Sequence, residues 1–298
     1  LDCPFWIKPN VAFSSYLGFR VDDARDFRDA IERIREGIGR FAEPFEYIAR
    51  HVGNGSALPE VGSGGTCVAE AIVSGELCTL EGFVQEGRTV VYGILDSLRG
   101  PNQVSFVCYR TPSRLPSQVR QRMVECAERV VARIGLNDTP FNMELFWDRV
   151  LDRVWLLEIN PRISKSHCAI FRLISGASHH EVAVDVALGR RPDFPRKEGA
   201  FPMAAKFMPR TYEDARVTRV PARADIRRLQ ERYPELIVHS HVAEGMRLSE
   251  LRDQDSYSFE IADVFLGGTS EEELHAKFRE VMNELDFRFS ASVETNYQ

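Results

Sequence analysis

The segment that most constrains this chain is residues 141–166, where two strand-like runs each carry a glutamate at a position expected to be apolar. Glu144 stands between a methionine and a leucine, and Glu158 follows a Trp-Leu-Leu run and precedes an isoleucine. A carboxylate in an apolar strand is costly unless another group pairs with it. Two carboxylates on neighbouring strands repel each other unless a cation lies between them. The pattern therefore predicts a hairpin that binds a cation.

The residues that follow Glu158 extend this predicted site. Asn160 points to the same face of a strand as Glu158 and supplies a third oxygen. Hard oxygen ligands suit Mg²⁺, which is usually held by one or two carboxylates together with substrate phosphates. We therefore expect Glu144, Glu158 and Asn160 to bind a magnesium–nucleotide complex. Arg162 suits contact with a carboxylate or phosphate, and a structural salt bridge is the equal alternative.

The composition is that of a soluble globular protein, since 44% of the 298 residues are hydrophobic and 28% are charged. A chain of this length folds as one large domain or as two to three small ones. Its apolar runs are too short to span a membrane, and no signal peptide begins it. The six cysteines lie far apart without a CxxC pair, which favours reduced thiols in the cytoplasm. The net charge of -6 argues against nucleic acid as the main partner.

The N-terminal stretch combines a lysine with small residues that suit an anion. A predicted strand at residues 3–8 ends in Lys8, and the following loop contains Ser14, Ser15 and Gly18. Such residues let backbone N–H groups approach an anion, and a lysine adds a point charge. An ordinary hairpin turn is the alternative, because the GxxxxGK[ST] pattern is missing. Since the chain enters this strand directly, we expect the natural polypeptide to extend further upstream.

Four strand candidates separated by turns predict an antiparallel meander at residues 67–73, 77–85, 89–97 and 104–109. Glu70 and Glu81 are carboxylates inside two of these apolar runs. An outward-facing surface position is the simpler interpretation of each one alone, because antiparallel strands often expose one face.

The rest of the chain alternates helices and strands, which predicts an α+β fold. An amphipathic helix is expected at residues 117–134, where it ends at Gly135. A later helix begins at Ser270, which forms a predicted capping box with Glu273. We expect three parts, divided as residues 1–66, 67–198 and 199–298.

Three segments in this order resemble the ATP-grasp superfamily: WIKP ending at Pro9, AEAIVSGE at residues 69–76 and LEINPR at residues 157–162. The C-terminal part is similar to the small α+β lobe of members related to biotin carboxylase and L-amino-acid ligases. D-alanine–D-alanine ligase belongs to the same superfamily. The resemblance implies an ATP-grasp fold, in which two α+β subdomains grip the nucleotide. Such members usually carry a pre-ATP-grasp domain, which we expect this chain to lack.

The resemblance also implies roles for residues near the N-terminus. Lys8 looks like the lysine that contacts the nucleotide phosphates and assists catalysis, with Ser14 and Ser15 in the loop that covers them. Glu70 resembles the glutamate at the edge of the adenine ring.

Around the expected hinge, the resemblance implies further nucleotide contacts. Ala71 and Ile72 would meet the ring through their backbone. Related proteins often hold the ribose with an acid after this hinge, and Glu76 is the candidate here. The spacing from Glu70, however, puts Leu77 at the ribose position, which is a departure from the family pattern.

The resemblance also implies roles for residues of the hairpin and for one residue near the substrate. Glu144, Glu158 and Asn160 resemble the family's magnesium ligands, which also accept Mn²⁺. Arg162 resembles the catalytic arginine that steadies the acyl phosphate. Glu81 sits where related enzymes keep an acidic residue near the substrate side.

The activity implied by this resemblance is ATP-dependent joining of a carboxylate to an amine through an acyl phosphate, on small molecules such as amino acids. A carboxylase-type or acid–thiol enzyme is a second possibility. A nucleotide-binding module without turnover is a third. The expected cofactors are ATP and Mg²⁺, the expected partners are small molecules and not nucleic acid or membrane, and the expected location is the cytoplasm. A homodimer is compatible with this scheme.

Overall fold

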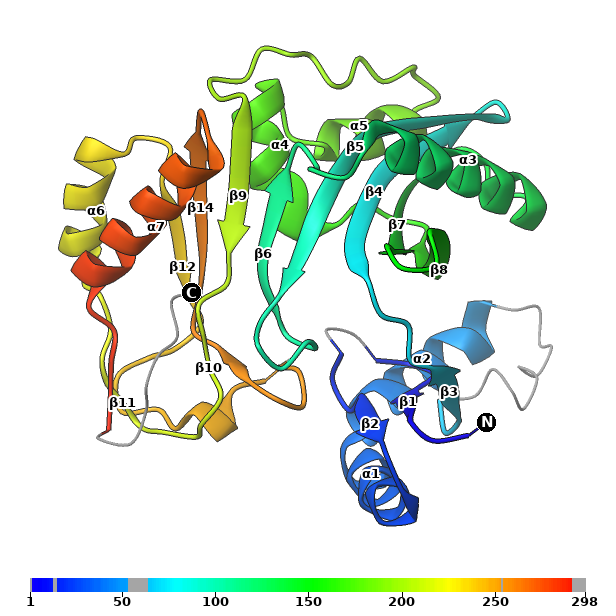
Figure 1. Ribbon diagram of the computed structural model, residues 1–298, viewed down its shortest axis with the longest axis horizontal. Coiled ribbons are helices and arrows are strands. Elements are labelled where there is room, and N and C mark those ends of the chain that lie inside the picture. The colour runs from blue at the N-terminus through cyan, green and yellow to red at the C-terminus, as the bar shows by residue number, and fades with distance from the viewer. Residues whose placement is uncertain (1, 13–14, 53–63, 253, 291–298) are drawn as a thin grey trace. The chain divides into compact units, whose positions relative to one another are not determined.

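The computed structural model describes residues 2–12, 15–52, 64–252 and 254–290, and Figure 1 shows the course of the chain. Two compact units are distinguished, and each is described by itself. Unit 1 comprises Leu1–Val73 and Glu250–Phe259, and unit 2 comprises Ser74–Ser249 and Glu260–Gln298. The three-part division expected from the sequence remains a proposal.

Unit 1 contains a small antiparallel sheet in the order β2-β1-β3, made of β1 (Phe5–Pro9), β2 (Phe19–Val21) and β3 (Cys67–Ala71). Helix α1 (Ala24–Gly37) begins after Asp23, whose carboxylate accepts two backbone N–H bonds, and α2 (Gly39–Val52) follows it. Apolar side chains of the sheet, its first loop and α1 form the core: Ile7, Leu17, Phe19, Val21, Ala30 and Ile34. Because β3 pairs with β1, its predicted place in the meander is wrong.

Unit 2 is built on an eight-stranded antiparallel sheet in the order β12-β14-β9-β6-β5-β4-β7-β8. Its strands are β4 (Glu76–Gln85), β5 (Arg88–Arg99), β6 (Phe106–Thr111), β7 (Thr139–Asp148), β8 (Arg153–Asn160), β9 (Met203–Phe207), β12 (Ile237–Ser240) and β14 (Ala262–Gly268). Strands β4, β5 and β6 form the meander that the sequence predicts. Because β6 pairs with β9, strands that precede residue 199 and strands that follow it belong to one sheet.

Helices cover both faces of this sheet (Figure 1). On one face, α3 (Ser117–Ile134) buries Val119, Met123 and Ala127 against β4 and β7. On the other, α4 (Cys168–Ser175) and α5 (His180–Ala187) pack on β4, β5, β9 and β14. Burying apolar area on both faces is the main favourable term in the stability of such a layered fold.

The remaining elements of unit 2 are α6 (Arg223–Arg232), α7 (Glu271–Leu285), the 3-10 helices η2 (Lys165–His167) and η3 (Leu248–Glu250), and short strands. Those strands are β10 (Arg210–Thr211), β11 (Val217–Arg219) and β15 (Arg288–Phe289), and β13 (Phe259–Glu260) lies at the unit boundary. Helix α7 packs on β9, where Phe207 and Phe278 stack with centroids 4.2 Å apart.

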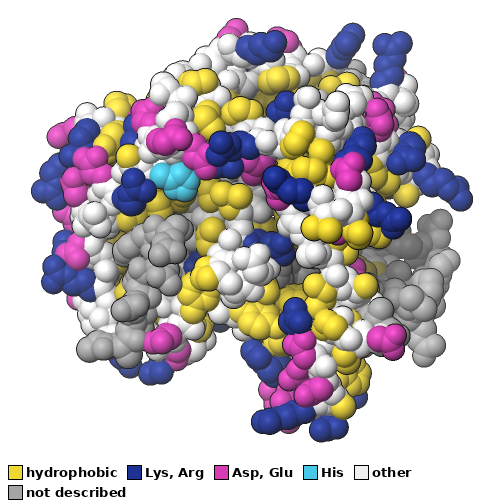
Figure 2. All heavy atoms as spheres, viewed as in Figure 1, with side chains coloured by type: hydrophobic (Ala, Val, Ile, Leu, Met, Phe, Trp, Pro, Cys, Tyr) yellow, Lys and Arg dark blue, Asp and Glu magenta, His cyan; other side chains and the backbone are white. Residues whose placement is uncertain are grey.

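Two further observations concern the hydropathy of the helices and the charges on the surface. No helix among the described residues is both long and apolar enough to cross a membrane. On the face drawn in Figure 2, side chains of Lys and Arg are interspersed with those of Asp and Glu.

Candidate functional site

The β7–β8 hairpin brings the three predicted metal ligands together. Glu144 and Glu158 are directly opposite each other in the antiparallel register, and Asn160 lies opposite Asn142. The amide Nδ2 of Asn160 donates a hydrogen bond of 2.8 Å to Oε1 of Glu158. Directly opposed residues project from the same face of a sheet, so all three side chains emerge on one face. The hairpin therefore places two carboxylates and one amide in a single group.

This donor set fits a magnesium ion. Like charges directly opposite each other on paired strands are destabilising, and a divalent cation would remove that repulsion. Glu158 is exposed and forms no ion pair with any described residue. Its carboxylate oxygens and the side-chain oxygen of Asn160 are the hard ligands that Mg²⁺ prefers.

Arg162 lies just past the hairpin on an exposed turn. Its backbone N–H donates to the Asn160 carbonyl at 2.8 Å, which sets the turn. Its guanidinium donates to the Ile163 carbonyl at 3.3 Å and makes no ion pair with the carboxylates of the described residues. The structural salt bridge considered from the sequence is thus not seen within the described part of the chain. A guanidinium available to an anionic ligand is the remaining interpretation.

In unit 1, Lys8 and Glu70 are brought together across two strands. Lys8 is opposite Val68, and Glu70 is opposite Trp6, so all four side chains project from one face. The ammonium of Lys8 lies 2.9 Å from a carboxylate oxygen of Glu70, and both side chains are about one-third exposed. The two residues that the family resemblance selected are therefore neighbours, and each partly neutralises the other.

The other predicted nucleotide contacts of unit 1 have varied surroundings. Ser14 lies outside the described residues. Ser15 occupies the left-handed region at φ 54° in the turn between β1 and β2, and its carbonyl accepts the Gly18 N–H at 3.1 Å. Ala71 ends β3, and Ile72 follows it with an exposed side chain. Their proposed contacts with a nucleotide remain predictions.

The candidate ribose contact belongs to unit 2. Glu76 begins β4 and pairs with Arg149, whose Nη2 lies 2.6 Å from the carboxylate. Leu77 is buried, with 5% of its surface exposed, and belongs to the hydrophobic core. The ribose role of Glu76 therefore stays a prediction, with Arg149 as its partner in this structure.

The sequence did not reveal a buried polar cluster around Glu81. The outward-facing position expected for this residue is wrong, because its side chain is 0% exposed. Its Oε1 accepts hydrogen bonds from Asn142 Nδ2 at 2.8 Å and from the Ser164 N–H at 3.3 Å, and it lies 2.7 Å from His167 Nδ1. Burial raises the pKa of Glu81 to about 8 and lowers the pKa of His167 to about 3.

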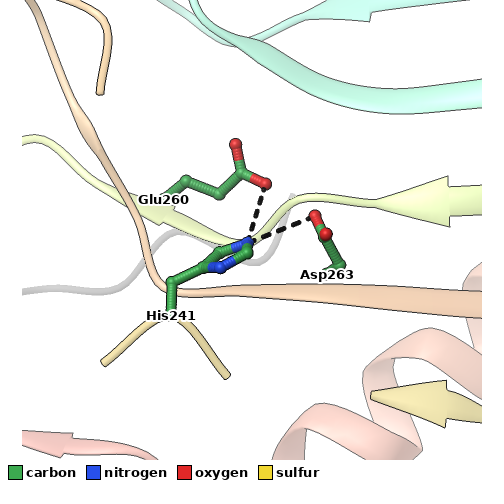
Figure 3. A group of neighbouring side chains, drawn as sticks. All are labelled: His241, Glu260 and Asp263. Carbon is green, nitrogen blue, oxygen red and sulfur yellow. Dashed lines mark ion pairs between the residues drawn. The ribbon is translucent and has the colours of Figure 1, made fainter. Parts of the chain in front are cut away.

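A second group, His241, Glu260 and Asp263, could be taken for a metal site (Figure 3). The imidazole Nε2 lies 3.4 Å from an oxygen of each acid. Lys206 Nζ, however, lies 2.7 Å from Asp263, and Arg210 pairs with Glu260. The nearby carboxylates of Asp263 and Glu260 raise the pKa of His241 to about 9, so the ring is protonated at neutral pH and has no free lone pair. We therefore interpret this group as an ion cluster.

Comparison with known proteins concerns the family and the fold of the chain. The model of an ATP-grasp domain family matches residues 1–170. A search of curated proteins gives no match. The predicted fold class, an α+β ATP-grasp fold, is confirmed.

Several solved structures have a similar fold. An L-amino acid ligase from Bacillus licheniformis has a TM-score of 0.68 at 17% identity, over 98% of this chain and 64% of that one. A biotin carboxylase domain from Hydrogenobacter thermophilus, in complex with MgADP and bicarbonate, has a TM-score of 0.62 at 14% identity, over 99% and 59%. A carboxyaminoimidazole ribonucleotide synthase from Aspergillus clavatus, complexed with ATP, has a TM-score of 0.61 at 14% identity, over 96% and 63%. This chain thus spans less than two thirds of each relative, and identities this low show the fold alone.

Proposed function

Because the chain belongs to the ATP-grasp domain family, we propose that it is an ATP-dependent ligase that activates a carboxylate and joins it to an amine. The observation that carries this proposal is the facing pair Glu144 and Glu158, with Asn160 beside it and Arg162 directly after it. ATP with Mg²⁺ is the proposed cofactor, and small molecules such as amino acids are the proposed substrates. The amine acceptor is proposed by analogy with the L-amino acid ligase, whose fold this chain resembles.

In the proposed reaction, a substrate carboxylate oxygen attacks the γ-phosphorus of ATP, which gives an acyl phosphate and ADP. The amine then attacks the carbonyl carbon, phosphate leaves, and the nitrogen loses a proton. Bound Mg²⁺ would neutralise charge on the phosphates. Phosphoryl transfer requires positioning and electrostatic stabilisation more than covalent chemistry from the protein.

The residues described above fit this requirement. Glu144, Glu158 and Asn160 would hold the ion, and Lys8 would contact phosphate oxygens. Arg162 would stabilise the negative charge of the acyl phosphate, since its planar guanidinium can donate two parallel hydrogen bonds to one anion.

The test is phosphate release by the full chain with ATP, Mg²⁺ and mixed amino acids. We expect release that requires both a carboxylate and an amine, and that falls about 100-fold or more in Glu158→Gln because transition-state charge loses its stabilisation. Chelation of the metal with EDTA should abolish release in the same way. As a matched control, Glu125→Gln alters an exposed glutamate of α3 and should leave the rate unchanged.

Two outcomes would contradict the proposal. Release that requires bicarbonate in place of an amino acid would indicate a carboxylase-type enzyme. Binding of ATP without turnover across a broad panel of acids and amines would indicate a nucleotide-binding module.

A further inference from the structure

Glu81 is a fully buried carboxyl group whose hydrogen-bond partners are all uncharged at neutral pH. They are the Asn142 amide, the Ser164 N–H and His167, an imidazole kept neutral by its burial. Burying a carboxyl group without a charged partner is costly, and these hydrogen bonds offset part of that cost. The side chain is 0% exposed, so it cannot touch a substrate in this conformation. Any contribution it makes to the reaction must therefore act through its neighbours.

Those neighbours lie on both sides of the candidate catalytic residues. Asn142 is in β7, directly opposite Asn160 in β8. Ser164 and His167 come two and five residues after Arg162 in the chain. Glu81 thus connects the strand beside the metal ligands to the segment that follows the arginine.

His179 binds the other backbone polar group of Ser164, its carbonyl. The Ser164 carbonyl accepts a hydrogen bond from His179 Nε2 at 2.9 Å, while its N–H donates to Glu81. A carbonyl can only accept, so His179 carries its proton on Nε2, and its Nδ1 accepts from the Tyr92 hydroxyl at 3.1 Å. Both backbone polar groups of Ser164 are therefore fixed by buried side chains.

We propose that Glu81 is a positioning residue, which fixes residues 160–164 by holding Ser164 and Asn142 and so sets the place of Arg162 relative to the metal ligands. This inference rests on the proposed function. It also predicts that hydrogen-bond geometry, and not the charge of Glu81, is what matters, because each partner contacts a carboxyl oxygen that an amide oxygen can replace.

Two substitutions separate these possibilities. Glu81→Gln keeps an oxygen that accepts from Asn142 and Ser164, whereas Glu81→Met has a similar length without a strong acceptor. We expect kcat to fall about 10- to 100-fold in Glu81→Met, with KM for ATP nearly unchanged, because a small misplacement affects the transition state. In Glu81→Gln, kcat should remain within about threefold of the wild type. Asp96→Asn, at a buried carboxylate of β5 that binds Arg110, controls for the general loss of a buried acid.

Equal losses of kcat in the Gln and Met variants would overturn the proposal in favour of a role for the charge. An unchanged kcat in Glu81→Met would overturn it outright. Should Glu81→Met fail to fold, His167→Phe removes one contact at the far end of the segment and should lower kcat in the same direction.

Combining variants tests whether Glu81 acts through Arg162. In an Arg162→Ala background, Glu81→Met should lower kcat by little more than Arg162→Ala alone, because both changes remove the same contribution. Full additivity of the two effects would contradict the inference.

Hydrogen–deuterium exchange gives a measurement that is independent of activity. Peptides covering residues 161–168 should exchange faster in Glu81→Met than in Glu81→Gln, while peptides of α6 should exchange at the same rate in both. If the wild type shows no turnover but this difference is present, the proposed function fails and the positioning contact stands. Equal exchange in the two variants, with turnover in the wild type, refutes the positioning role alone.

Discussion

At the scale of residues, His241 and Glu81 show how surroundings set the affinity of a side chain for protons. The nearby carboxylates of Asp263 and Glu260 raise the pKa of His241 to about 9. For Glu81, burial raises the pKa to about 8 although the Asn142 amide favours the charged form. His241 thus keeps its positive charge because two acids lie beside it. Glu81 shifts towards its neutral form because it is buried away from water.

The His241 cluster predicts a pH dependence of stability. In the folded state the pKa lies near 9, compared with an ordinary value of 6.5, so the contribution of His241 is complete below pH 6.5 and is lost as the pH rises through 9. Denaturant unfolding between pH 6 and pH 9.5 should therefore show a decline that is smaller in His241→Gln. The neighbouring exposed histidine serves as a control, because His239→Gln should leave the decline intact. Parallel declines in wild type and His241→Gln would show that Asp263 and Glu260 do not hold the imidazolium.

At the scale of elements, helix α7 illustrates how local sequence sets a boundary. Ser270 precedes the helix, and its hydroxyl accepts the Glu273 N–H at 3.2 Å, as the predicted capping box requires. The Glu273 carboxylate reaches back one residue further than expected and accepts the Thr269 N–H at 2.7 Å. The bond to Ser270 satisfies an N–H group that the first turn of a helix leaves without a partner, and the bond to Thr269 ties the preceding residue to the helix.

Removing this cap should weaken the helix. We expect Ser270→Ala to lower the free energy of unfolding by about 1 kcal/mol, since an N-cap hydroxyl is lost. Thermal or denaturant unfolding checks the value, and Ser270→Asp, which keeps an acceptor at this position, should restore most of it. A loss of stability as large in Ser270→Asp as in Ser270→Ala would rule out capping as the cause.

At the scale of the whole molecule, binding of the proposed cofactor can be measured through stability, without any turnover. A ligand that binds only the folded state stabilises it by mass action. MgATP at 100 times its Kd should therefore raise the free energy of unfolding by about 2.7 kcal/mol.

The same measurement checks the phosphate contact. Lys8→Ala should reduce the stabilisation by MgATP at a fixed concentration, because the charge that we propose to contact the phosphates is lost. Arg28→Ala removes an exposed charge of α1 and should leave the stabilisation by MgATP unchanged. Equal stabilisation of Lys8→Ala and the wild type would show that the family role given to Lys8 is wrong here.

Much of the fold followed from local patterns. The helix predicted at residues 117–134 is α3, which ends at Gly135 in the left-handed conformation as expected. The two runs that carry Glu144 and Glu158 pair as a hairpin, and their opposition was predicted from the cost of unpaired carboxylates. Helical periodicity, caps and turns are determined by residues close in the chain, which is why these predictions succeeded.

Other features depended on partners distant in the sequence. Strand β3 was expected to pair with β4, but it pairs with β1 near the N-terminus. Glu81 was expected at the surface, because alternation shows that a strand has two faces but not that helices cover both of them.

The sequence by itself determined the LEINPR hairpin, the order of the family motifs, the ends of α3 and the start of α7, since each depends on short-range spacing. Only the tertiary structure decided that α4 and α5 close over β4 and bury Glu81 beside His167 and Ser164. Residues 81 and 164 meet because β4, β7 and α4 pack in one layered unit, and no local pattern encodes that contact. The arrangement that we propose to position Arg162 therefore becomes visible only in the folded chain.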